Sequence, residues 1–261
     1  MAHLTGTTPL HVAQSGHGPA VVLLHYFGAS GRAWTQTAEL LKDHFWIVMP
    51  DLRGFGESGA LPAVYKVADA ADDVLEMVCT LDLQRYVLVG HSMGGKIAMA
   101  VAARHPPGLV QLMLLAPSPP SPEPITPADR VQLLANQLDP TAAEKTIRTS
   151  CAQSLPDGIF RQVMIDRQRT TPEGWRWWLE QGSKEDISSS LPPISVPCQV
   201  LVGALDSTIP PSLVQSEVMP HLLAGDIRIV PGVGHLLPLE APHMVAQAIK
   251  DFTFENQRNA Q

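Results

Sequence analysis

The sequence predicts an α/β fold, in which a mostly parallel central sheet is flanked by helices and carries an inserted helical cap. Short apolar runs rich in Val and Leu recur up to residue 118 and again after residue 190, and such runs are typical of strands buried on both faces. Amphipathic segments lie between the runs, which implies βαβ units. The stretch between them has helical patterns but no strong strand pattern, and this predicts the insertion.

Each element is predicted from its own pattern. The predicted strands cover residues 9–16, at the edge of the sheet, 20–25, 45–49, 86–89, 109–115, 199–203 and 227–230. Helices are predicted where apolar residues recur at a spacing of three or four. They cover residues 67–81, 94–104, 127–138, 141–155, 157–170, 173–182, 212–223 and 244–252.

The chain is predicted to divide into three stretches. Residues 1–118 and 191–261 form the two parts of the α/β core, and residues 119–190 form the helical cap. Six of the residues from 117 to 127 are proline. A segment of this composition is stiff and extended, so we interpret it as the connector between core and cap.

Composition narrows the classes of function. The 261 residues are 45% apolar and 16% charged, which is typical of a globular chain. The formal net charge of −7 provides no electrostatic reason to bind nucleic acid or an anionic membrane. No apolar run approaches the roughly 18 residues that cross a bilayer. We expect a monomer or homodimer that acts on a small molecule, without a nucleic-acid or membrane partner.

The N-terminus and the cysteines indicate a cytoplasmic protein without cofactors. Residues 1–6 lack the basic start and apolar core of a signal peptide. The odd number of cysteines and the absence of a C-x-x-C pair argue against a disulfide framework or a zinc site. We expect reduced, buried thiols at Cys79, Cys151 and Cys198. The sequence has no dinucleotide-binding glycine motif, Walker loop or metal-ligand spacing, so no cofactor and no metal is expected.

The strongest functional signal is GHSMGG at residues 90–95, which matches G-x-S-x-G between a predicted strand and a predicted helix. This is the context of a nucleophile elbow, whose serine lies in a sharp, strained turn. Gly90 and Gly94 lack the side chains that would collide there. The N-terminus of the following helix directs free N–H groups toward developing negative charge. Ser92 is therefore the predicted nucleophile, and a chance glycine–serine turn is the alternative.

A serine hydroxyl is a poor nucleophile without a base beside it. His235 lies in a glycine-rich loop after the last predicted strand, and in this chain order the base comes last. His243 is the nearest competitor, but it is predicted to lie at the surface where a helix starts. Asp206 follows the preceding strand and is the predicted acid that orients the imidazole. The alternative position, after the strand before the cap, offers no carboxylate before Glu123.

An oxyanion hole needs two backbone N–H donors, and we expect them from Met93, after the nucleophile, and from Phe27, in the loop after the first buried strand. The loop DLRGFGES at residues 51–58 is expected to be pinned by an Asp/Arg ion pair, with a direct catalytic role as the alternative.

We expect the substrate pocket to be lined by aromatic and histidine side chains that lie near these motifs. Three tryptophans end the predicted cap, and at helical spacing they cannot all face one way. Their alternative role is ordinary packing of cap onto core. The predicted lining residues are Tyr26, His91, Trp175 and Trp178.

These blocks resemble the α/β-hydrolase superfamily, and the resemblance covers nearly the whole chain. It is carried, in the family's order, by residues 23–25 (LLH), 51–58, 90–95, 201–206 (LVGALD) and 234–235 (GH). Within the family the chain looks like small serine esterases, haloperoxidase-like perhydrolases, enol-lactonases and carbon–carbon bond hydrolases. The resemblance implies an α/β-hydrolase fold. It also implies a triad of Ser92, His235 and Asp206, with the oxyanion hole at Met93 and Phe27.

Two features of the sequence refine the resemblance. Serine at position 92 argues against the haloalkane dehalogenase and epoxide hydrolase branches, whose nucleophile is a carboxylate. The family usually has His-Gly where this chain has His25-Tyr26. If that position requires a positive φ, a tyrosine there is strained by about a kcal/mol or more.

The expected activity is hydrolysis of carboxylic esters of small to medium, mostly apolar substrates through an acyl-enzyme. Lactonase, carbon–carbon bond hydrolase and perhydrolase activities use the same triad and remain alternatives. A non-catalytic ligand receptor or a cofactor-free oxygenase that uses the His/Asp pair is the alternative from another class.

Overall fold

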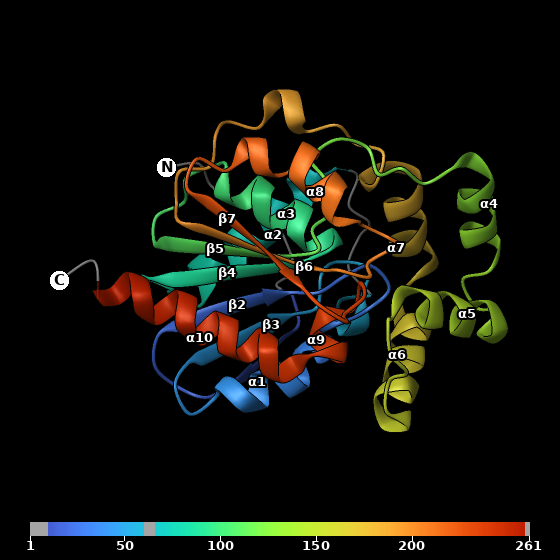
Figure 1. The fold of residues 1–261 in the computed structure, drawn as a ribbon, viewed down its shortest axis with the longest axis horizontal. Coiled ribbons are helices and arrows are strands. Elements are labelled where there is room, and N and C mark those ends of the chain that lie inside the picture. The colour runs from blue at the N-terminus through green and yellow to red at the C-terminus, as the bar shows by residue number, and fades with distance from the viewer. Residues whose placement is uncertain (1–9, 60–65, 259–261) are drawn as a thin grey trace.

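A seven-stranded sheet with helices on both faces forms the centre of the molecule (Figure 1). The structure is a computed structural model that describes residues 10–59 and 66–258. The strand order is β1-β3-β2-β4-β5-β6-β7, and β1 runs antiparallel to β3, while the other pairs are parallel. The strands are β1 (Val12–Ser15), β2 (Ala20–Leu24), β3 (Trp46–Pro50), β4 (Tyr86–His91), β5 (Leu109–Leu115), β6 (Cys198–Gly203) and β7 (Gly225–Val230). The expected fold is confirmed.

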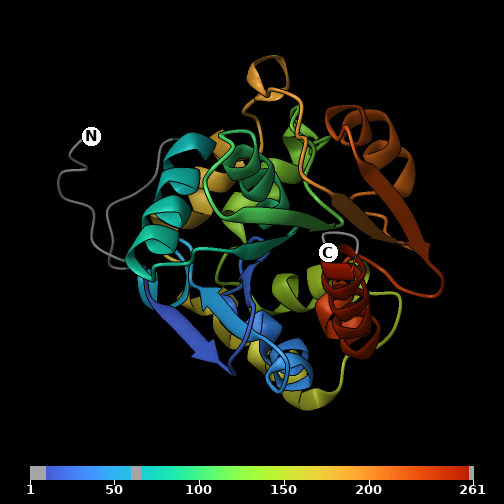
Figure 2. The same ribbon diagram turned by 90° about the vertical axis from the view of Figure 1, so that its left-hand side faces the viewer.

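The apolar runs form the central strands of the sheet, where helices cover both faces. Every residue of β2 and β4 is buried. On one face of the sheet lie α2 (Val67–Thr80), α3 (Met93–Ala102) and α8 (Pro211–Glu217), and on the other lie α1 (Thr35–Leu41) and α10 (Pro242–Arg258) (Figure 2). Each layer of helices closes its own apolar core against the sheet.

Two short helices were not predicted from the sequence. These are α1, with seven residues, and α9 (Leu237–Glu240), with four. A helix of one or two turns is too short to establish a helical period of apolar residues. The predicted helix over 212–223 is also shorter in the structure, since α8 ends at Glu217 and a 3₁₀ turn follows at Met219–His221.

Four helices follow β5 and stand beyond one end of the sheet (Figure 1). They are α4 (Pro127–Ala135), α5 (Pro140–Ser150), α6 (Asp157–Arg169) and α7 (Pro172–Trp177), and one π-helical turn, Trp178–Gly182, continues α7. Thr126, Asp139 and Thr171 accept hydrogen bonds from backbone N–H groups in the first turns of α4, α5 and α7, and each is followed by a proline. The caps explain why three of these helices begin where they do.

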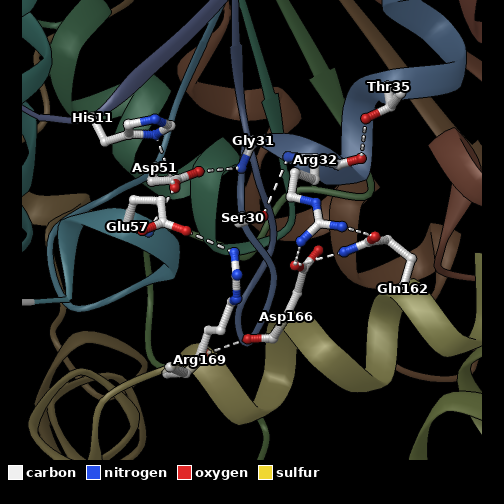
Figure 3. A network of polar contacts seen from close by, with 11 residues as sticks. His11, Ser30, Gly31, Arg32, Thr35, Asp51, Glu57, Gln162, Asp166 and Arg169 are labelled. Carbon is white, nitrogen blue, oxygen red and sulfur yellow. Dashed lines mark hydrogen bonds and ion pairs between the residues drawn. The ribbon is translucent and has the colours of Figure 1, made fainter.

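Charged side chains join α6 to two loops of the core (Figure 3). Arg32 contacts Gln162 and the buried Asp166, and Arg169 pairs with Glu57 at 2.7 Å. On the core side, Asp51 accepts hydrogen bonds from the N–H groups of Gly31, at 2.7 Å, and Glu57, at 2.8 Å. Asp51 thus holds together the two loops on which α6 rests.

The Asp/Arg ion pair expected to pin residues 51–58 is present, and its acidic partner lies outside the loop. Arg53 forms a two-point contact with Asp73 of α2 and not with Asp51. Asp51 points instead at backbone N–H groups. Each of its two carboxylate oxygens accepts a hydrogen bond from one of them. The loop is therefore attached to α2 through Arg53 and to the preceding loop through Asp51.

Other predictions have mixed outcomes. Cys198 is buried and Cys151 is half-buried, but Cys79 is exposed on α2, so the expectation of a buried thiol was wrong there. No described helix has both the length and the apolarity to cross a membrane. Residues 1–6, from which we expected no signal peptide, lie outside the described residues.

The Arg53–Asp73 contact provides a test of the fold. Both side chains are nearly buried, so removing one partner leaves a poorly solvated charge. We expect Asp73→Ala to lower the free energy of unfolding by about 2–4 kcal/mol, measured by urea denaturation. The neighbouring Asp72 forms an exposed pair with Arg104, and Asp72→Ala should cost less than about 1 kcal/mol. Equal losses in the two variants would contradict the assignment.

Candidate active site

The strand-to-helix turn at Ser92 has the strained backbone expected of a nucleophile elbow. Ser92 has φ 52° and ψ −116°, which is rarely adopted by a residue with a side chain. A Cβ on Gly90 would lie 2.4 Å from the carbonyl oxygen of Gly94, and one on Gly94 would lie 2.7 Å from that of Leu24. The backbone of α3 thus approaches β2 and β4 so closely that only glycine fits at these two positions.

The structure brings the three predicted triad residues together at the carboxyl ends of three strands. Ser92 follows β4, Asp206 follows β6 and His235 follows β7. The Nε2 atom of His235 lies 3.0 Å from Ser92 Oγ, and its Nδ1 atom lies 2.8 Å from Asp206 Oδ2. All three residues are buried. In this geometry Nδ1–H donates to the carboxylate, and Nε2 accepts from the serine hydroxyl.

Asp206 is positioned by its own loop. Its second oxygen, Oδ1, accepts hydrogen bonds from the N–H groups of Thr208 and Ile209, both at 2.8 Å. The anion is therefore held in one orientation while its other oxygen faces the imidazole.

The backbone of His235 is held by residues from other elements. Its N–H donates to the carbonyl of Ser150 at the end of α5, at 2.7 Å. Glu240 of α9 accepts hydrogen bonds from the N–H groups of Gly234 and Ala152, at 3.1 and 2.7 Å. The position of His235 therefore depends on the last turn of α5 as well as on the core.

His91 does not line the substrate cavity, so this prediction was wrong. Its ring is fully buried behind the triad, and its Nε2–H donates to the carbonyl oxygen of His235 at 2.8 Å. Burial, together with the neighbouring His235, lowers the pKa of His91 well below its usual value of 6.5. The neutral ring positions the loop that carries His235. The G-x-S-x-G pattern leaves the second residue open, so it carries no signal for this role.

The loop after β2 has the arrangement expected for an oxyanion hole. Within the described chain, the N–H groups of Phe27 and Met93 donate to no other protein group. Burial lowers the pKa of His25, whose neutral ring donates from Nδ1 to the carbonyl of Tyr26 and accepts at Nε2 from the N–H of Leu52. His25 therefore fixes this loop against the loop that follows β3.

The tyrosine that departs from the family pattern is not strained. The positive φ of this loop falls on Gly28, at 79°, and Tyr26 does not adopt one. A Cβ on Gly28 would lie 3.2 Å from the ring of Trp175. The loop thus has its glycine at the point where Trp175 approaches. Tyr26 has an ordinary backbone conformation, and its side chain forms part of the cavity wall.

A cavity of about 200 Å³ opens beside Ser92 and His235. Three of the four predicted pocket residues line it, namely Tyr26, Trp175 and Trp178, whereas Trp177 packs in the core. The rest of the wall is mostly apolar and includes Phe27, Ile125, Leu133, Ile147, Val163, Leu179, Ile209 and Leu236. The described residues contain no cluster of His, Cys, Asp or Glu side chains suited to a metal ion.

Two ionisable residues of the cavity wall were missed. Glu123 lies in the proline-rich connector after β5, and burial raises its pKa despite nearby Ser118 and Lys96. Arg167 lies on α6, and burial lowers its pKa to about 10. Glu123 is the first carboxylate in the chain after β5, and this place was a usable signal. The sequence offered no sign of which face of α6 meets the cavity.

The comparisons with known proteins agree with this geometry. Residues 21–248 match the sequence profile described as the alpha/beta hydrolase family. A thermophilic esterase from Thermogutta terrifontis, solved with malate bound, is 31% identical, with a TM-score of 0.77 over 94% of this chain and 93% of that one. A pimeloyl-[acyl-carrier protein] methyl ester esterase from Vibrio vulnificus is 28% identical over 80% of this chain and 84% of its own length.

Another relative is similar over a shorter region. An uncharacterized protein of Mycobacterium tuberculosis is 35% identical over 102 residues, which are 39% of this chain. The match spans only 30% of the length of that relative.

The buried neutral ring of His91 predicts a pH dependence of stability. Below about pH 6.5 the unfolded chain binds a proton at this residue that the folded chain does not, so stability is complete above that pH and falls below it. We expect His91→Gln, which keeps a donor, to flatten the pH dependence below pH 6.5 by about 1.4 kcal/mol per pH unit.

The measurement is the free energy of unfolding in urea between pH 5 and pH 8. His243→Gln is the matched control, because His243 is exposed at the start of α10. Wild-type slopes in both variants would show that His91 is not held neutral by the fold.

Proposed function

The chain belongs to the alpha/beta hydrolase family, and we propose that it is a serine hydrolase that cleaves carboxylic esters of small to medium, mostly apolar substrates. The observation that carries the proposal is the chain of contacts from Ser92 Oγ through the ring of His235 to Asp206. The hydroxyl at one end of this chain lies in the wall of the cavity. A hydroxyl, an imidazole and a carboxylate in this order form a nucleophile with its base and orienting acid.

The first half of the reaction acylates the serine. Ser92 Oγ attacks the ester carbonyl carbon while His235 Nε2 takes the hydroxyl proton. The carbonyl oxygen becomes an oxyanion, which accepts hydrogen bonds from the N–H groups of Met93 and Phe27. The carbon–oxygen bond to the alcohol then breaks, and His235 returns its proton to the departing oxygen. Asp206 stabilises the imidazolium between these two transfers.

The second half releases the acid. Water attacks the acyl carbon and gives a proton to His235. The oxyanion that forms again accepts hydrogen bonds from the two N–H groups. The bond to Ser92 Oγ breaks, the serine regains the proton, and the carboxylic acid leaves. The electrostatic contribution of each oxyanion donor is about 3–4 kcal/mol in comparable sites.

Ester cleavage is favoured by two further considerations. The similar proteins include a methyl ester esterase and a thermophilic esterase, and both matches extend over most of the chain. The cavity wall is predominantly apolar and aromatic, which suits an acyl group with little polarity. We assign the role of a cap over this cavity to residues 119–190, because Ile125, Leu133, Ile147, Val163 and Trp175 supply much of its wall.

The same triad is able to open lactones, cleave carbon–carbon bonds beside a carbonyl or form peracids. A panel of p-nitrophenyl esters, lactones and vinylogous diketones ranks these activities by kcat/KM. The ester assignment requires that esters are the preferred group.

Replacing the nucleophile tests the mechanism directly. We expect Ser92→Ala to reduce kcat on p-nitrophenyl acetate and butyrate by about 10³-fold or more, because no covalent intermediate forms. Mass spectrometry of wild-type enzyme quenched during turnover should detect an acyl group on the peptide that contains Ser92.

Ser216→Ala is the control, since this exposed serine of α8 lies outside the cavity, and it should retain wild-type activity. Unchanged turnover in Ser92→Ala would refute the covalent role of Ser92.

A further inference from the structure

Arg167 is a cation in the wall of an otherwise largely apolar cavity. The residue is only 7% exposed, and its guanidinium carbon lies 4.2 Å from the ring centre of Trp175. Its Nε and Nη2 groups donate to the carbonyls of Gln137 and Asn136, just after α4, at 3.1 and 3.2 Å. The ring and the two carbonyls therefore hold the guanidinium in one place and one orientation.

None of these contacts neutralises the charge of Arg167. Among residues 10–59 and 66–258, no carboxylate lies within ion-pair distance of it, and its Nη1 group has no hydrogen-bond partner. Arginines nearby differ in this respect, since Arg32 pairs with Asp166 and Arg169 with Glu57. A buried charge without a counter-ion is costly, and an incoming anion relieves that cost.

Arg167 stays charged at neutral pH, although burial lowers its pKa to about 10. Tyr26 lines the same cavity and is close enough for the positive charge to act on its phenol. Burial raises the pKa of this phenol, so Tyr26 keeps its proton and remains a hydrogen-bond donor. This part of the cavity thus offers positive charge and donors.

Glu123 is another ionisable residue of the cavity wall. Glu123 interacts electrostatically with His235 and Lys96, and burial raises its pKa, which disfavours further negative charge there. Burial beside the connector thus disfavours an anionic group of a substrate, whereas the guanidinium of Arg167 on α6 attracts one. The same wall carries Ser92 and Arg167, so it can hold a reacting ester beside Ser92 and a carboxylate at Arg167.

We propose that the preferred substrates are esters that carry a free carboxylate at the end remote from the reacting ester, such as half-esters of dicarboxylic acids, and that Arg167 binds this carboxylate. This inference rests on the ester hydrolysis proposed above and specifies its substrate class. The methylene chain of such a molecule lies along the apolar wall, and its terminal carboxylate forms an ion pair with the guanidinium.

The test compares monomethyl adipate with dimethyl adipate at pH 7.5, with hydrolysis followed by methanol release. Wild-type enzyme should show the higher kcat/KM on the half-ester, counted per ester group. Arg167→Gln should lower kcat/KM on the half-ester by about 10–100-fold, which corresponds to a charged hydrogen bond, and change that on the diester by less than about threefold. Arg167→Lys should retain part of the preference.

Arg161→Gln is the matched control, because Arg161 is an exposed arginine on the same helix and removal of its charge should leave both rates unchanged. If Arg167 only stabilises α4 and Trp175, Arg167→Gln will lower both rates by the same factor, and this result would overturn the proposal. A wild-type enzyme that prefers the diester, or treats the two alike, would overturn it as well.

A measurement on the wild-type enzyme covers the case in which the variants do not fold. Hexanoate should inhibit hydrolysis of p-nitrophenyl acetate more strongly than hexanamide, which has a similar shape but no charge. Equal inhibition would overturn the role of Arg167. The proposed function fails separately, since it requires hydrolysis of p-nitrophenyl acetate that depends on Ser92.

Discussion

The position of the His235 imidazole is the constraint on which the site depends. The ring contacts Ser92 at one nitrogen and Asp206 at the other, at 3.0 and 2.8 Å. These residues follow β4, β6 and β7, so the parallel register of the sheet decides whether they meet. A shift of one residue in a strand would turn each following side chain to the other face. The buried sheet thus fixes the geometry of the two hydrogen bonds of the His235 ring.

The helices inserted after β5 take part in this positioning. Ser150, at the end of α5, accepts the hydrogen bond from the N–H of His235, and Glu240 links the neighbouring Gly234 to Ala152. Arg32 and Asp166 join α6 to the loop that carries Phe27. The cavity wall and the reacting groups therefore belong to one hydrogen-bonded assembly. A displacement of α5 would also displace His235.

The cavity combines an apolar wall with two ionisable side chains, one on the connector and one on α6. Glu123 stands near the triad, whereas Arg167 is stacked on Trp175 beneath α4. Apolar surface alone distinguishes poorly between acyl chains of similar size, because one methylene contributes only about 1–3 kcal/mol. A buried cation discriminates far more sharply, since its effect depends on whether the ligand supplies an anion. Charge placement therefore gives this cavity a selectivity that its apolar wall lacks.

The sequence by itself determined the strands, the elbow and the three residues that meet at the carboxyl edge of the sheet. Buried strands need continuous apolar runs, and the sharp turn at Ser92 needs glycine on both sides, so both requirements leave a local pattern. Tertiary structure alone decided that Arg53 pairs with Asp73, that His91 supports the loop of His235, and that Arg167 lines the cavity. The partner of a side chain depends on which element packs against it and at what rotation. That information is spread over the whole chain, and no local spacing carries it.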